Sequence, residues 1–308
     1  MNVWDPERVV DAALARALLR DQFPDLTLAS IEPLGVGWDV TVYLVDDTWA
    51  VRFPRREVAA PTLLREIALL PALAPRLPLP VPVPQLVGRP TDAFPWTFWG
   101  APVVRGRELA EAGLPDDARE PLAREVGGFL RALHDPALAH ELGADLPRDP
   151  MRRAIPSTRG PMARAALDRL AGRGTWTAGS GVDRAVDDVV AAADPLEAPT
   201  GAPVLVHGDL HLRHLLVGPA GAAAGIIDWG DACLADPALD LALPYAAFAG
   251  PSRAAFFEAY GAEPNEPREL RARVLALCLC AVLADYADQT GVPDLLAESL
   301  AGVRRATR

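Results

Sequence analysis

The 308-residue sequence contains no lysine, and all 30 of its basic residues are arginines. A phosphate-binding loop of the Walker type is therefore excluded, because its lysine cannot be supplied. Schiff-base catalysis, which needs a lysine amine, is excluded as well. Wherever the chain needs a permanently charged basic side chain, it must use the planar guanidinium of arginine.

The sequence also has fewer basic residues than acidic ones. The 30 arginines are set against 41 acidic residues, so the net charge is −11 and the isoelectric point is about 5.0. Such a chain repels nucleic acid phosphates, and no nucleic acid partner is expected. An acidic surface attracts cationic substrates, but the need for solubility explains the charge equally well.

Cysteines and long hydrophobic runs are scarce. The three cysteines form no disulfide framework, and two of them lie in an apolar run typical of a protein core. The longest apolar run, Val274–Ala284, is too short to cross a bilayer of about 30 Å as a helix. The first ten residues lack the pattern of a secretory signal. We therefore expect a cytoplasmic protein, monomeric and without a membrane partner.

The first 104 residues are predicted to be rich in strands. A helix is expected at the start, with Asp5 as its N-cap and Pro6 in its first turn. Tight turns are expected at Gly35–Gly37 and at Asp46–Asp47, and a second helix from Pro61. The expected strands cover residues 26–35, 40–47, 48–55, 85–88 and 97–104.

From Arg105 onward the pattern becomes helical, interrupted by one β-rich island over residues 204–231. Strands with one internal helix, followed by helices with one small β island, indicate a bilobal α+β architecture. The expected domains are a small β-rich N-lobe, residues 1–104, and a large helical C-lobe, residues 105–308.

The island carries the strongest chemical signal, His207-Gly208-Asp209 followed by Asp228-Trp229-Gly230. In protein kinases a catalytic H-R-D is followed five residues later by a metal-binding asparagine, and then by D-F-G. Here His214 holds the position five residues after Asp209, and Asp228 follows the next strand. Pairing of the two intervening strands would bring His214 and Asp228 to one metal and leave Asp209 facing an acceptor hydroxyl.

The segments HGDLHLRHLLV and IIDWGD resemble the aminoglycoside and macrolide phosphotransferase family, which shares the protein-kinase fold. The resemblance extends over nearly the whole chain. It implies transfer of the γ-phosphate of ATP or GTP to a hydroxyl of a small molecule, with Mg²⁺ as cofactor. By the same resemblance Asp209 is the catalytic base, Asp228 the principal Mg²⁺ ligand, His207 a brace of the loop, and Asp240 a further support of it.

His214 departs from the aminoglycoside enzymes, where asparagine binds magnesium, and resembles the macrolide 2'-phosphotransferase branch. A neutral imidazole binds divalent ions, although Mg²⁺ prefers oxygen. The segment WAVRFPRR resembles the same branch. The resemblance therefore implies an antibiotic acceptor, a macrolide or an aminoglycoside, with GTP serving at least as well as ATP.

The N-terminal half offers residues for the nucleotide. A kinase needs a cation on its third strand, paired with a glutamate on the next helix, to hold the phosphates. Arg52 and Glu66 are the candidates, because no lysine exists. Gly35 and Gly37 are expected to cover the phosphates with backbone amides.

The nucleotide base is expected to pair with the backbone of the segment FWGAPVV, at Ala101 and Val103. For the acceptor, the tail places only Asp285 and Asp288 among many apolar residues, which favours a bulky apolar molecule over a polycation. Glu258 is a further carboxylate that would have to join a polycation pocket.

Several alternatives stay open on the residues alone. A choline-, homoserine- or sugar-kinase-like metabolite kinase has the same motifs, and a nucleotide-binding pseudokinase with a partner-binding role would tolerate Arg52 and His214. His207, His211 and His214 would form a zinc cluster if they shared one helical face. Asp231 and Asp236 are expected to cap helices rather than to touch a substrate.

Overall fold

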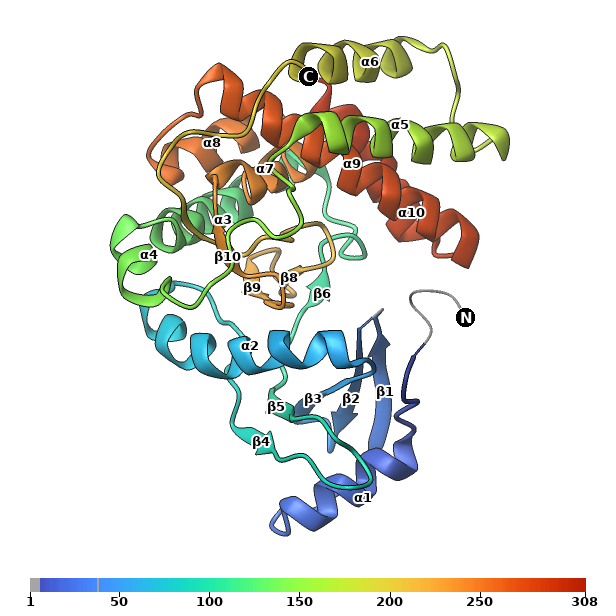
Figure 1. Ribbon diagram of the computed structural model, residues 1–308. Coiled ribbons are helices and arrows are strands. Elements are labelled where there is room, and N and C mark those ends of the chain that lie inside the picture. Colours follow the sequence, from blue (N-terminus) through green and yellow to red (C-terminus); the bar gives the residue numbers. More distant parts are fainter. Residues whose placement is uncertain (1–5, 38) are drawn as a thin grey trace. The chain divides into compact units, whose positions relative to one another are not determined.

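The computed structural model describes residues 6–37 and 39–308, which divide into two compact units (Figure 1). The first unit comprises residues 1–76 and 80–104, and the second comprises residues 77–79 and 105–308. The main division thus falls between Val104 and Arg105.

The first unit contains an antiparallel sheet of five strands in the order β1-β2-β3-β5-β4. The strands are β1 (Ile31–Val36), β2 (Val40–Val45), β3 (Trp49–Pro54), β4 (Leu86–Gly88) and β5 (Phe98–Pro102). The helices are α1 (Ala12–Gln22) and α2 (Ala60–Leu73), the latter flanked by 3₁₀ turns at Glu57–Ala59 and Ala74–Arg76. The predicted turn between β2 and β3 is confirmed, since Asp46 and Asp47 have φ of 52° and 49°, as a tight hairpin turn requires.

The expected start of the first helix is wrong. Helix α1 begins at Ala12 rather than at Pro6, because the carboxylate of Asp11 caps it by accepting from Leu14 N–H at 2.8 Å. The expected cap, Asp5, lies outside the described residues. Before the helix, Glu7 N–H donates a hydrogen bond to the carbonyl of Arg55 at 3.0 Å.

The first strand is shorter than expected, and its glycine is placed differently. Residues before Ile31 are not in the sheet, because Leu28 N–H and Ser30 N–H donate to the carboxylate of Asp46, each at 2.9 Å. Gly35 belongs to β1 itself, opposite Val42, rather than to a turn. The strand therefore starts later and continues further than the sequence pattern suggested.

The two faces of this sheet are covered by different helices. On one face Phe53 and Phe98 stack with centroids 4.7 Å apart, in a buried cluster that includes Leu18 and Leu19 of α1. Arg52 and Trp99 alternate to the opposite face, as the period of a strand requires, and meet Glu66 of α2 there.

The segment Glu57–Arg76, which contains α2, is long and apolar enough by length and composition to cross a membrane. It carries the buried Glu66 carboxylate, which accepts a hydrogen bond from Trp99 Nε1 at 3.0 Å. The segment is therefore explained as the helix that covers one face of the sheet.

The second unit is mainly helical. Its helices are α3 (Glu120–Leu133), α4 (Pro136–Leu142), α5 (Pro156–Gly172), α6 (Gly181–Ala193), α7 (Ala242–Ala247), α8 (Gly250–Tyr260), α9 (Glu266–Thr290) and α10 (Pro293–Ala306), with 3₁₀ turns at Asp116–Ala118 and Pro237–Leu239. Its strands are β6 (Arg107–Glu108), β7 (Val204–Val206), β8 (Leu215–Val217), β9 (Ala223–Ile226) and β10 (Cys233–Ala235). Strands β6, β8 and β9 form one small sheet, and β7 pairs with β10. The α+β class with a β-rich first half and a helical second half is confirmed.

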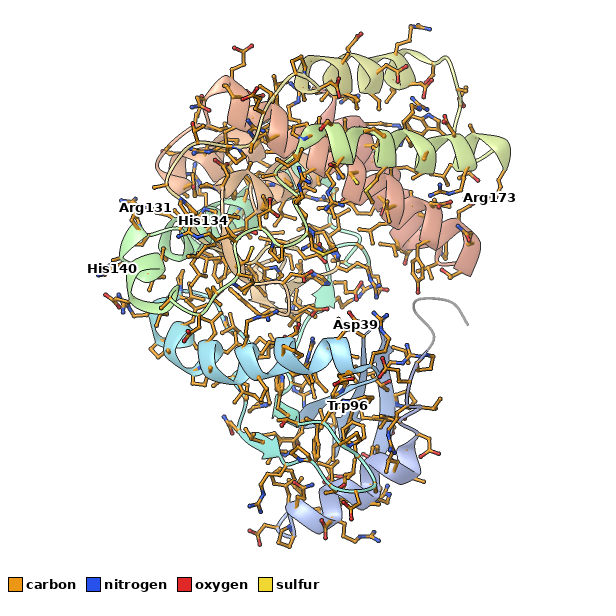
Figure 2. The ribbon with its side chains drawn as sticks, in the orientation of Figure 1. Asp39, Trp96, Arg131, His134, His140 and Arg173 are labelled. Atoms are coloured by element: carbon orange, nitrogen blue, oxygen red, sulfur yellow. The ribbon has the colours of Figure 1, made fainter. Side chains whose placement is uncertain are left out.

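Ion pairs with arginine connect the acidic residues at the end of α9 to α5 and to the residue that follows it. Asp285 is bound by Arg169 at 2.8 Å and by Arg173, which lies just beyond α5 (Figure 2). Arg173 also binds Asp288, whose second oxygen accepts from Thr175 Oγ1 at 2.8 Å. Burial alone would raise the pKa of Asp285, but the two guanidinium groups hold it below its usual value.

Candidate active site

The island of the sequence forms a loop between β7 and β8. Gly208 has φ of +87°, and a Cβ atom there would lie 2.3 Å from the carbonyl oxygen of Asp231. Only glycine satisfies both conditions. The chain therefore turns sharply at Gly208, and Asp209 follows with its side chain 23% exposed.

His207 is completely buried and joins this loop to the end of β9. Its Nε2 lies 2.9 Å from the carbonyl of Ile227, to which it donates, and its Nδ1 accepts from Asp209 N–H at 3.3 Å. Burial lowers the pKa of His207, which keeps the imidazole neutral in the tautomer that these two contacts require. His207 thus ties the position of Asp209 to the residue that precedes Asp228.

Asp240 is fully buried beneath the same loop. Its carboxylate accepts from the backbone N–H groups of His207 at 2.8 Å and Gly208 at 2.9 Å. His134 Nε2 is 3.1 Å from the same carboxylate, and its Nδ1 is 2.9 Å from the hydroxyl of Tyr260. Burial alone would raise the pKa of Asp240, but the hydrogen bond and charge of His134 and the backbone donors hold it below its usual value.

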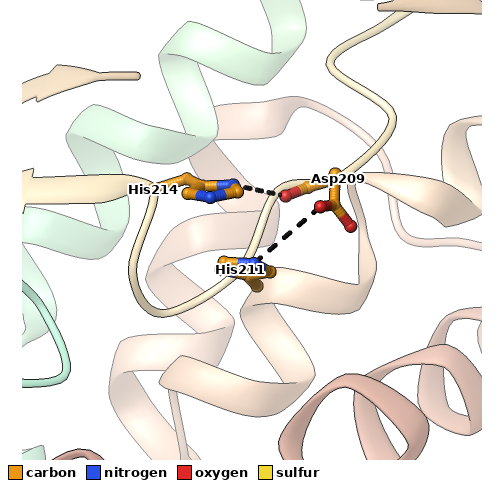
Figure 3. Close-up of side chains that lie close together, drawn as sticks. All are labelled: Asp209, His211 and His214. Carbon is orange, nitrogen blue, oxygen red and sulfur yellow. Dashed lines mark hydrogen bonds and ion pairs between the residues drawn. The ribbon is translucent and has the colours of Figure 1, made fainter. Parts of the chain in front are cut away.

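His214 and Asp228 meet at one end of the β8–β9 hairpin. Leu215 pairs with Ile226, and Ile227 N–H donates to the carbonyl of His214 at 3.0 Å. Asp228 is the next residue, and its Oδ2 lies 3.5 Å from His214 Nε2. His214 Nδ1 donates to the backbone carbonyl of Asp209 at 2.8 Å (Figure 3), which leaves the lone pair of neutral His214 on Nε2. A nitrogen lone pair and a carboxylate oxygen facing each other suit a divalent cation.

His211 lies against this pair. Its ring stacks on His214 with centroids 3.7 Å apart, and its Nε2 is 3.9 Å from Asp209 Oδ2 (Figure 3). Ligand atoms of Asp209, His211 and His214 all lie within 4.8 Å of one another. The zinc cluster on a helical face does not form, because residues 207–214 are not helical and both nitrogens of His207 are hydrogen-bonded.

In the first unit, Arg52 and Glu66 form the expected pair. Arg52 Nη2 lies 3.3 Å from Glu66 Oε1, and the guanidinium carbon lies 5.4 Å from the centre of the Trp99 ring. Trp99 Nε1 donates to the other Glu66 oxygen. The arginine is therefore held by a buried carboxylate and an indole.

The backbone of β5 has a defined alternation. Val103 N–H donates to Thr48 O at 2.8 Å on the β3 side, whereas Gly100 O accepts from Gln85 N–H at 2.8 Å on the β4 side. Adjacent residues of a strand direct their backbone groups to opposite sides, so Ala101 faces β3 and the Pro102 carbonyl faces away from it. The Val103 N–H is thus committed within the sheet.

The two candidate glycines differ in their surroundings. Gly37 N–H donates to the carbonyl of Val40 at 2.8 Å, and a Cβ at Gly37 would lie 3.5 Å from that oxygen. A Cβ at Gly35 would meet no atom within 4 Å among the described residues. Neither glycine is demanded by packing.

Residues 30–275 match the family model described as the phosphotransferase enzyme family. The chain belongs to this family. The match extends over parts of both compact units and includes His207, Asp209, His214 and Asp228, so the family assignment made from the sequence is confirmed.

Solved structures agree with the family assignment. The GDP and kanamycin complex of APH(2")-IIIa is 22% identical, with a TM-score of 0.66, over 95% of this chain and 97% of that one. Macrolide 2'-phosphotransferase type I is 24% identical, with a TM-score of 0.54, over 95% and 97%. MphH from Brachybacterium faecium is 23% identical, with a TM-score of 0.54, over 94% and 98%. At these identities the likeness establishes the shared fold.

A curated protein is similar over a much shorter stretch. The uncharacterized protein YcbJ of Bacillus subtilis is 41% identical over 56 residues. That match spans 18% of this chain and 18% of YcbJ. It therefore says nothing of the whole protein's activity.

Two contacts of the phosphotransferase site were not foreseen. Among the described helices none is capped by Asp231, which instead binds Arg153 at 2.8 Å, so that expectation is wrong. Arg153 also reaches Asp209, at 3.3 Å. No local pattern marks Arg153, which comes from a distant segment. Asp236 does cap the 3₁₀ turn at Pro237–Leu239, as expected.

Asp240 generates a prediction for stability. We expect Asp240→Asn to lower the free energy of unfolding by about 3 kcal/mol at pH 7, because the variant disrupts a buried, fully hydrogen-bonded carboxylate. Since the folded pKa lies below the ordinary 3.8, the contribution is complete above pH 3.8 and disappears as the pH falls through the folded value. Denaturant unfolding as a function of pH measures this difference.

The control is Asp187→Asn, which removes an exposed carboxylate paired with Arg164. We expect it to cost less than about 1 kcal/mol, as surface ion pairs do. A difference between wild type and Asp240→Asn that stayed constant below pH 3.8 would contradict the role given to the ionised carboxylate.

Proposed function

We propose that the protein transfers the γ-phosphoryl group of ATP or GTP to a hydroxyl of a small molecule, with an antibiotic as the acceptor. The observation that carries the proposal is the convergence of Asp209, His214 and Asp228 in one loop and hairpin. Relatives of this fold crystallise with GDP and kanamycin or are named macrolide 2'-phosphotransferases. Membership of the phosphotransferase family agrees with this chemistry.

In this proposal Asp209 orients the acceptor hydroxyl and accepts its proton while the hydroxyl oxygen attacks the γ-phosphorus. Its carboxylate is partly exposed, which leaves it accessible to an acceptor. The backbone carbonyl of Asp209 meanwhile orients His214, so the base and the candidate metal ligand are held by one short segment.

The residues present fit a divalent ion. His214 Nε2 and Asp228 Oδ2 would hold Mg²⁺, which when bound neutralises charge on the nucleotide phosphates. Asp228 has φ of +66°, a backbone conformation that residues other than glycine rarely adopt. Such local strain is typical of functional positions, and it directs this carboxylate toward His214.

The proposal assigns nucleotide binding to residues 1–104 and acceptor binding to residues 105–308. Arg52, held by Glu66, would bind phosphate oxygens, and amides near Gly35 and Gly37 would cover them. For the base, the outward-facing Pro102 carbonyl is better directed than Ala101 or Val103. We further propose a monomer that acts in the cytoplasm.

Among antibiotics, a bulky and partly apolar macrolide is favoured. The carboxylates that a polycation would need are already bound by arginine: Asp285 by Arg169 and Arg173, and Glu258 by Arg124. Each such pair cancels the charge that would attract an aminoglycoside ammonium group.

The first prediction concerns the base. We expect Asp209→Ala to lower the turnover rate by at least about 100-fold, as positioned acid–base groups contribute about 10²–10⁴-fold. Nucleotide affinity should change little, since the side chain contacts the acceptor. A coupled assay and nucleotide titration calorimetry measure the two effects. Asp168→Ala, at an exposed carboxylate of α5, is the control. Retention by Asp209→Ala of more than about a hundredth of the wild-type rate would refute the assignment.

The metal ligands give a second prediction. Asp228→Asn and His214→Ala should each raise the Mg²⁺ concentration at half-maximal activity, and Asp228→Asn should raise it more, because a carboxylate is the harder and charged ligand. His140→Ala, at an exposed histidine of α4, should leave the midpoint unchanged (Figure 2). An unchanged midpoint in His214→Ala would remove that residue from the metal site.

The acceptor is tested directly with wild-type protein. Steady-state rates with a macrolide, an aminoglycoside, choline, homoserine and a simple sugar, each with ATP and GTP, should be highest for the macrolide, with GTP at least as good as ATP. Efficient kanamycin turnover without macrolide turnover would overturn the acceptor and leave the phosphotransferase proposal standing. Transfer to none of them, with nucleotide bound, would favour the pseudokinase alternative.

A further inference from the structure

A partly buried arginine contacts the candidate base. Arg153 lies in the loop between α4 and α5, and its side chain is 14% exposed. Its Nη2 is 3.3 Å from Asp209 Oδ1 and 2.8 Å from Asp231 Oδ2. One guanidinium nitrogen therefore bridges the catalytic loop and the segment that follows Asp228.

The loop that carries Arg153 is fixed by its own hydrogen bonds. The carboxylate of Asp149 accepts from the N–H groups of Arg153 at 2.7 Å and Ala154 at 3.0 Å. Asp149 N–H donates to Leu234 O of β10 at 3.1 Å, and Arg271 of α9 donates to Ala154 O at 3.2 Å. The loop is thus attached to both β10 and α9.

The backbone of this loop is also strained. Asp149 and Arg152 have φ of 31° and 49°, values that cost free energy in residues other than glycine. Strand β10 pairs with β7, which leads directly into the catalytic loop. The strain therefore occurs where the Arg153 loop is joined to the strand pair that carries Asp209.

We propose that Arg153 is a positioning residue that holds Asp209 Oδ1, so that Oδ2 faces the acceptor hydroxyl, with Asp231 holding Arg153 in turn. This inference rests on the proposed function. The two oxygens of Asp209 have different surroundings, Oδ1 beside Arg153 and Oδ2 on the side of His211. A partly exposed carboxylate rotates freely unless one oxygen is held, and a fixed orientation accelerates transfer.

Electrostatics support this arrangement. Burial alone would lower the pKa of Arg153, but the carboxylates of Asp209 and Asp231 raise it above its usual value. The guanidinium is therefore charged throughout the working range of pH. Asp231 offsets the charge that Arg153 would otherwise add beside the reacting groups.

The test compares Arg153→Gln, Arg153→Lys and Asp231→Asn with the wild type. We expect Arg153→Gln to lower kcat about 10–100-fold, with the nucleotide KM unchanged, because the base is still present but no longer oriented. Arg153→Lys should recover about a tenth of the wild-type kcat or more, since it keeps the charge but not the planar geometry. Asp231→Asn should lie between Arg153→Gln and the wild type.

The matched control is Arg152→Gln, which removes the same charge from the adjacent, exposed position and should retain wild-type kcat. A kcat of Arg153→Gln within about twofold of the wild type would overturn the inference. The inference would also be overturned if Arg153→Gln and Arg153→Lys lost the same amount of kcat and both lost nucleotide affinity as well. That result would indicate a purely structural role.

A second measurement needs no activity. The melting temperatures of Arg153→Gln, Asp209→Asn and the double variant should be non-additive if the two side chains interact. Additive shifts would overturn the inference even if the enzyme is active. Coupled shifts together with a wild-type chain that phosphorylates no acceptor would overturn the proposed function, and with it the positioning role.

Discussion

The active-site loop depends on one buried carboxylate. Asp240 accepts hydrogen bonds from the backbone of His207 and Gly208, at the point where the chain leaves β7 and reverses. A reversed backbone cannot complete a strand ladder, so its N–H groups need other acceptors inside the protein. Asp240 supplies both oxygens, and His134 Nε2 contacts one of them at 3.1 Å. The position of Asp209, and through its carbonyl that of His214, follows from this single anchor.

Features encoded by adjacent residues were predictable from the sequence. The Asp46–Asp47 hairpin and the meeting of His214 with Asp228 follow from strand patterns and short connections. The Arg52–Glu66 pair follows from the kinase pattern of a cation on a strand and a glutamate on the next helix. The start of α1 could not be predicted, because Asp5-Pro6 and Asp11 carry equally good local capping signals. The carbonyl of Arg55 accepts a hydrogen bond from the chain before α1, and this contact keeps that chain out of the helix. No local sequence pattern reveals the contact.

The features that the sequence did not predict depend on contacts between residues distant in the sequence. Strand β10 was missed because three residues, Cys233–Ala235, are too few for a periodic signal, and their pairing with β7 closes a long connection. Asp231 was misassigned for the same reason, since its partner Arg153 lies on the loop before α5. Because the sequence has no lysine, arginine must serve as every permanently charged basic group. The sequence does not show which carboxylate each arginine binds.

This distinction explains why the reaction was easier to infer than the acceptor. The groups proposed for phosphoryl transfer lie within one loop and one hairpin, and a contiguous motif specifies them. Acceptor preference depends instead on which charges remain uncompensated after helices from distant segments pack together. The carboxylates of Asp285 and Asp288 would attract a polycation if they were free, yet Arg173 binds both. The scarcity of acidic residues in this segment of the sequence already favoured an apolar acceptor, and the pairing of these two carboxylates with arginine in the fold supports the same preference.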